Sequence, residues 1–162
     1  MLLSLLLALT SENEAPSTGE ARACVNNHVA EDYGDGWRVR NVGAFEVSED
    51  NNRYMLLTLV SEVEYRFVSC GDARAHMVRI VVYDENGRLI ADTRPEDGTV
   101  HEGRQAEMNF TPEHSGNYFV GVRLIEATPP PPETGKSGRR RSKGQEEEQA
   151  PSAAIGLGVL YR

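Results

Sequence analysis

The sequence of 162 residues contains only two cysteines, one tryptophan and four histidines. A structural zinc site needs cysteine and histidine ligands at short spacings. The two cysteines are far apart and the histidines show no H-x-x-x-H or H-E-x-x-H pattern, so no zinc site is predicted and no residue is assigned as a metal ligand. The apolar segment at residues 1–9 is shorter than the ~20 residues that a membrane-spanning helix requires. We therefore expect no membrane span.

Basic residues are also scarce, with 17 lysines and arginines against 25 acidic residues and a net charge of -8. Binding to nucleic acid requires a basic face that neutralises phosphates. The single basic run, Arg139-Arg140-Arg141, is soon followed by Glu146-Glu147-Glu148, and mixed charges of this kind indicate a solvated loop. A nucleic-acid partner is therefore not expected.

Catalytic motifs are missing as well. The chain has no G-x-S-x-G elbow, although Asp84, His114 and Ser115 could supply the parts of a nucleophilic triad. The segment His114-Ser115-Gly116 is better explained as a turn that opens the next strand. We predict no catalytic residues and no enzymatic activity.

The feature that the chain does have is the two-residue alternation of β-strands. Residues 77–83 are nearly all apolar, and Asn86-Gly87 after them predicts a hairpin with a type I′ turn, which needs positive φ at both positions. Strand-like segments recur at intervals of roughly 8–12 residues. This pattern predicts an all-β fold, an antiparallel, jelly-roll-like β-sandwich of about eight strands. The expected core face contains Val63, Tyr65, Phe67, Val78, Ile80, Val82, Met108, Phe110, Tyr118, Val120 and Val122.

The composition divides the chain into segments. Residues 1–10 resemble the apolar part of a signal peptide, and the polar residues 11–23 are predicted to form a disordered leader. The β-sandwich domain is expected at 24–162, with a low-complexity, disordered insertion at 128–152. The alternating residues 153–162 predict a final strand that pairs with 117–126. Gly156 and Gly158 on one face of that strand would let another layer approach closely.

The two cysteines are expected to form a disulfide, Cys24–Cys70. Such a bond would close a loop of about 47 residues and would stabilise the fold by roughly 4 kcal/mol in the chain-entropy model. Together with the apolar start, it predicts a periplasmic, cell-surface or secreted protein. The alternative is a pair of buried free thiols in a cytosolic protein.

Tyr33 and Trp37 are the candidate binding residues, because they lie in a glycine-containing loop where aromatic rings are often exposed. They would serve either as a protein-contact anchor or as a stacking surface for a carbohydrate. The acidic turns at 32–36 and 84–87 leave calcium open as a ligand, but neither matches the calcium loop of an EF-hand and both suit turn chemistry. No other cofactor is expected.

The segment from Arg53 to Glu126 resembles the bacterial pre-peptidase C-terminal domain family through LVSEVEYRFVSCGD, IVVYDENGRLIADT and FTPEHSGNYFVGV. The same features are similar to those of the GOLD domain. The resemblance implies a jelly-roll-like sandwich that serves secreted proteins as a non-catalytic accessory module. We therefore expect an exported module for protein–protein interaction or scaffolding in a periplasmic or cell-surface assembly. The alternative is a carbohydrate- or calcium-binding accessory module.

Overall fold

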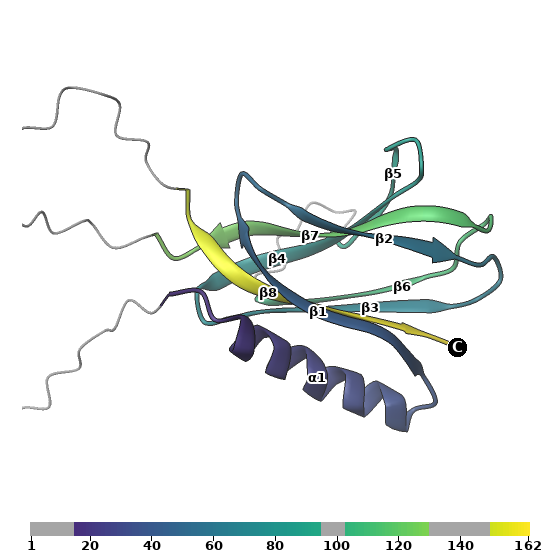
Figure 1. Ribbon diagram of the computed structural model, residues 1–162, viewed down its shortest axis with the longest axis horizontal. Helices are drawn as coiled ribbons and strands as arrows, with labels where there is room; N and C mark the ends of the chain where they lie inside the picture. The colour runs from purple at the N-terminus through teal and green to yellow at the C-terminus, as the bar shows by residue number, and fades with distance from the viewer. Residues whose placement is uncertain (1–14, 95–102, 130–149) are drawn as a thin grey trace, which may run out of the picture.

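The computed structural model describes residues 15–94, 103–129 and 150–162, which form two packed β-sheets and one helix (Figure 1). The signal-peptide-like segment predicted at 1–10, the first part of the leader predicted at 11–23 (residues 11–14), and residues 130–149 of the insertion predicted at 128–152 lie outside the described residues. The elements, in chain order, are α1 (Thr18–Gly34), β1 (Arg38–Ser48), β2 (Arg53–Leu59), β3 (Tyr65–Gly71), β4 (Ala75–Tyr83), β5 (Leu89–Asp92), β6 (Gln105–Phe110), β7 (Gly116–Ala127) and β8 (Ser152–Tyr161). Among the described residues, no helix has both the length and the apolar character needed to cross a membrane.

The strands form two four-stranded antiparallel sheets, in the orders β1-β8-β3-β6 and β2-β7-β4-β5. Each successive strand changes sheet, except that β4 and β5 form a hairpin within one sheet. This arrangement of eight strands is a jelly roll. The predicted fold class is confirmed.

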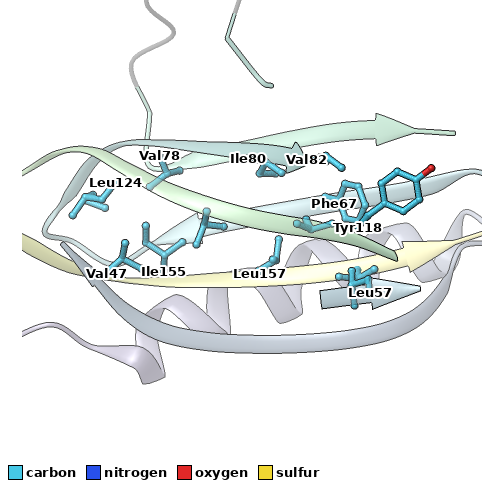
Figure 2. Packing of buried hydrophobic residues seen from close by; sticks show 14 of the residues in the cluster. Val47, Leu57, Phe67, Val78, Ile80, Val82, Tyr118, Leu124, Ile155 and Leu157 are labelled. Carbon is cyan, nitrogen blue, oxygen red and sulfur yellow. The ribbon is translucent and has the colours of Figure 1, made fainter. Parts of the chain in front are cut away.

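The hydrophobic core lies between the two sheets, where side chains of both inner faces meet (Figure 2). Phe67 and Ile155 from one sheet and Ile80 and Val120 from the other are fully buried. The predicted core face is confirmed for these strands, and Val63, Met108 and Phe110 lie half-buried at its margin. The two-residue alternation therefore identified the inward side of most strands.

The hairpin after β4 forms by a different turn from the one predicted. Gly87 has a positive φ of 77°, but Asn86 does not, so the turn is not type I′. The Asp84 carboxylate accepts hydrogen bonds from the backbone N–H groups of Asn86 and Arg88, at 3.0 and 2.8 Å. An Asp side chain that caps its own turn in this way removes the need for a second residue with positive φ.

The predicted final strand is present as β8, but its predicted partner was wrong. β8 does not pair with β7; it lies between β1 and β3 in the other sheet. Every residue from Ala153 to Leu160 is buried, so both faces of the strand are covered. A central strand with a covered outer face requires a second layer, and the helix supplies it.

Residues 18–34 form helix α1, which packs on the outer face of the β1-β8-β3-β6 sheet (Figure 1). The prediction of a disordered leader at 11–23 is therefore wrong from Thr18 onward. Ser17 caps the helix by accepting a hydrogen bond from the Glu20 N–H. Ala21, Val25 and Val29, spaced four residues apart, bury one narrow face against the sheet. So few apolar residues in a polar segment gave little sign of a helix.

Ser17, the residue that caps helix α1, is bound to the sheet through a buried carboxylate. Asp72, which is 1% exposed, accepts hydrogen bonds from the backbone N–H groups of Ser17 at 2.7 Å and Ala154 at 3.1 Å. A third bond comes from the Arg74 N–H. One side chain thus joins the start of α1 to β8.

The disulfide between Cys24 of α1 and Cys70 of β3 is confirmed, with the two Cα atoms 5.9 Å apart. Cys70 is completely buried in a second cluster between helix and sheet, which includes Val25, Val29 and Leu160. The bond therefore fastens the helix to β3, beside the central strand β8.

Gly156 and Gly158 lie where the helix approaches β8, so the close approach predicted at these glycines is confirmed. A Cβ atom added to Gly156 would lie 2.6 Å from Val25 Cγ2 and 2.7 Å from the backbone oxygen of Ala21. One added to Gly158 would lie 2.9 Å from Val29 Cγ2. The layer that approaches β8 at these two glycines is helix α1.

Substitution of Gly156→Ala is expected to lower the unfolding free energy by about 1–3 kcal/mol, because the helix backbone would have to move away from the sheet. The matched control is Gly43→Ala in β1, where the nearest atom to an added Cβ is 3.6 Å away, on the Phe45 ring. Urea unfolding of both variants measures the difference. Equal stability of the two variants would contradict the seating of the helix on β8.

Candidate interaction surface

The predicted binding residue Trp37 is not exposed. Its side chain is 3% exposed and belongs to the cluster between helix and sheet. The guanidinium of Arg66 lies 5.1 Å from the centre of its ring and that of Arg162 lies 4.4 Å away. Because the residues before Trp37 form the end of a helix and not an open loop, the chain turns back and buries the ring. The prediction that Trp37 is a surface anchor is wrong.

Tyr33, the other predicted binding residue, is 66% exposed near the end of α1. Since Trp37 points into the protein, the two rings do not form one surface. A contact role for Tyr33 alone stays a prediction.

The remaining polar candidates from the sequence have structural roles. The Asp32 carboxylate pairs with Arg66, and the Asp84 carboxylate caps the β4–β5 turn. The Ser115 hydroxyl accepts the backbone N–H of Ser61 at 2.9 Å. Within the described part of the chain, the one group of three side chains placed to hold a metal is Cys24, His28 and Cys70, and the disulfide occupies both sulfurs.

The outer face of the β2-β7-β4-β5 sheet differs from its counterpart, because no described helix or strand covers it (Figure 1). The pairing register places four outward apolar side chains next to one another, one from each strand: Leu56, Phe119, Tyr83 and Leu89. Leu56 is 61% exposed, Leu89 47% and Phe119 37%, and Tyr83 is half-buried. Neighbouring strands lie ~4.8 Å apart, so this apolar row extends over about 14 Å.

A shallow hollow of about 330 Å³ adjoins the apolar row and is lined by Tyr54, Tyr83, Gly87 and Phe119. Tyr54 lies across Gly121, its neighbour on β7, so closely that an added Cβ at Gly121 would be 2.4 Å from the Tyr54 ring. The Tyr54 ring also meets Tyr83 edge-on, with centroids 5.8 Å apart. Because Gly121 has no side chain, the Tyr54 ring lies close against β7, where it forms one wall of the hollow.

The sequence contains one sign of this surface. Residues 54–60 are nearly all apolar, a pattern typical of a buried strand, but β2 is an edge strand with Tyr54 and Leu56 exposed. Phe119 likewise lies between the two inward residues Tyr118 and Val120. Apolar residues on both faces of a strand indicate either full burial or an exposed apolar face, and only the tertiary structure decides between them.

No protein-family model matches the sequence, and no curated protein matches it. Among solved structures, the chain is similar to PliG of Aeromonas hydrophila, a periplasmic lysozyme inhibitor of g-type lysozyme. The two chains share 11% identity over 75% of this chain and 83% of PliG, with a TM-score of 0.42. A likeness of this degree identifies neither a family nor a function.

Proposed function

We propose that the protein is a non-catalytic module that binds a protein partner through the outer face of the β2-β7-β4-β5 sheet. The apolar row of Leu56, Phe119, Tyr83 and Leu89 is the observation that carries this proposal. Contiguous exposed apolar side chains mark interaction sites, and aromatic residues are enriched at the centre of protein interfaces. The hollow beside the row would accept one anchoring side chain of the partner.

The lining of the hollow supports binding more than catalysis. It offers two tyrosines, a phenylalanine and a glycine, which together provide aromatic surface and two phenolic hydroxyl groups. Such a lining holds an apolar group in a fixed orientation, whereas acyl or phosphoryl transfer needs a nucleophile beside a base or an anion-stabilising group.

Export is part of the proposal. A disulfide that fastens a helix to a sheet persists in an oxidising compartment, so the Cys24–Cys70 bond supports a periplasmic, cell-surface or secreted location. The resemblance of residues 53–126 to the pre-peptidase C-terminal domains would give the module an accessory role in a larger exported assembly.

Carbohydrate binding is the second candidate function, and the position of the Tyr54 ring favours it. Tyr54 is 45% exposed and is held over Gly121, where it presents an aromatic ring to solvent. The apolar face of a sugar ring packs against such a ring, while its hydroxyl groups stay hydrated. This candidate would use the sheet face in place of the loop at Tyr33 and Trp37.

Site-specific photocrosslinking separates these functions. A photoreactive amino acid at Leu56 is expected to give one discrete protein adduct in cells of the source organism, and the same group at Asn26 on the exposed side of α1 is not. Phe119→Ser should abolish the adduct. A lack of adducts from Leu56, together with glycan-array binding that Tyr54→Ala removes, would replace the protein partner with a carbohydrate. If both experiments are negative, the face is not a binding surface.

A further inference from the structure

Two arginines lie directly opposite each other on the proposed interaction surface. Arg79 of β4 pairs in register with Arg123 of β7, next to the pair formed by Val81 and Gly121. Val78, Ile80, Val122 and Leu124 point into the core, so both arginines point outward. Both are half-buried. Their Cβ atoms are expected to lie ~5 Å apart, and like charges at this distance destabilise a sheet.

Within residues 15–94, 103–129 and 150–162, no acidic side chain pairs with Arg79 or Arg123. Among the described residues, neither side chain forms a hydrogen bond or an ion pair. The nearest acid in register, Asp92 opposite Val81, interacts with Arg94 through both carboxylate oxygens. Other arginines of this acidic chain do have carboxylate partners, as Arg66 does with Asp32 and Arg162 with Glu64.

An uncompensated pair of guanidinium groups beside an aromatic hollow suits a ligand that is both anionic and apolar. A guanidinium binds a carboxylate with two parallel hydrogen bonds, and partial burial strengthens that interaction by removing water. The ligand's charge would also relieve the repulsion between Arg79 and Arg123. The free protein therefore carries an unfavourable feature that binding would correct.

We propose that the partner docks an extended acidic segment on this face, with a carboxylate on Arg79 and Arg123 and an apolar side chain in the hollow. The inference rests on the proposed function, since it names the chemistry of the partner for the same surface. Along a strand, alternate side chains on one face are ~6.8 Å apart. Arg123 is two residues from Gly121 and four from Phe119, so the carboxylate and the apolar side chain should be two to four residues apart in the bound segment.

The test uses the full chain and a display library of random nine-residue peptides. We expect the selected peptides to contain Asp or Glu two to four positions from a Leu or an aromatic residue. The best peptide, measured by fluorescence polarisation in 150 mM salt, should bind at least tenfold more weakly to the double variant Arg79→Gln/Arg123→Gln. A matched double variant, Arg22→Gln/Arg40→Gln, removes two exposed charges from α1 and β1 and should bind normally.

A second measurement shows that lost binding does not reflect lost folding. Because Arg79→Gln/Arg123→Gln removes a like-charge pair, its melting temperature should equal or exceed that of the parent protein. Selected peptides without acids, whose binding needs Phe119 but not the arginines, would overturn the acidic segment and leave the proposed function intact. Binding to anionic lipid vesicles or to RNA, with no peptide selected, would overturn both. Peptides that bind equally well to Phe119→Ser would show that the ligand lies elsewhere and would overturn both.

Discussion

A chain that ends at Ala150 is expected to be unfolded at all temperatures. The truncation removes β8, which pairs with β1 on one side and β3 on the other. Without it, β1 loses its only neighbour in the sheet and α1 loses the strand that its glycine contacts require. The effect should therefore be loss of the whole fold, and not only the exposure of the β3 edge that β8 covers.

The expected size of this effect follows from the side chains that β8 buries. Ile155, Leu157, Val159 and Leu160 are all completely buried. At roughly 1.5–3 kcal/mol for each buried aliphatic side chain, they contribute about 6–12 kcal/mol, which is comparable with the ~5–15 kcal/mol total stability of a domain. The truncated chain should give a disordered far-ultraviolet circular dichroism spectrum.

Two controls accompany the truncation. A chain that ends at Tyr161 keeps β8 and loses only the Arg162 contacts to Glu64 and Trp37, so it should remain folded. A synthetic peptide of residues 150–162 should restore the spectrum when it is added to the truncated chain, because the gap between β1 and β3 accepts it. A truncated chain that is folded without the peptide would contradict the central position of β8.

The strands of this protein were predictable from the sequence, but their order was not. Alternation identified 153–162 as a strand from its own residues, whereas its neighbours are separated from it by more than 80 positions along the chain. Helix α1 was missed because it buries one residue per turn, Ala21, Val25 and Val29. The S-x-x-E sequence from Ser17 to Glu20, which is typical of a helix N-terminus, was the local sign that could have identified its start.

The candidate site depended even more on long-range register. Leu56, Phe119, Tyr83 and Leu89 become neighbours only because β2, β7, β4 and β5 pair in one particular alignment. The sequence places them in four separate strands with no shared motif. The burial of Trp37 was not predicted for a related reason. The two arginines that cover its ring, Arg66 of β3 and Arg162 after β8, are far from it in the sequence.

Reduction of the Cys24–Cys70 disulfide is expected to lower the unfolding free energy by about 4 kcal/mol without unfolding the protein. In the chain-entropy model this is the effect of releasing a loop of about 47 residues in the unfolded state. The folded state should persist, because Val25 and Val29 still pack on the sheet and Asp72 still binds the Ser17 N–H.

Three measurements by urea unfolding identify the cause of the loss. The reduced parent protein and the Cys24→Ser variant, which cannot form the bond, should lose nearly the same free energy, since Cys24 is half-buried and Cys70 keeps its place in both. Cys70→Ala should lose more, because it also opens a cavity beside Val68 and Leu160. A loss below about 1 kcal/mol on reduction would mean that the bond does not restrain the unfolded chain. The disulfide would then serve some purpose other than stability, and it would support export less strongly.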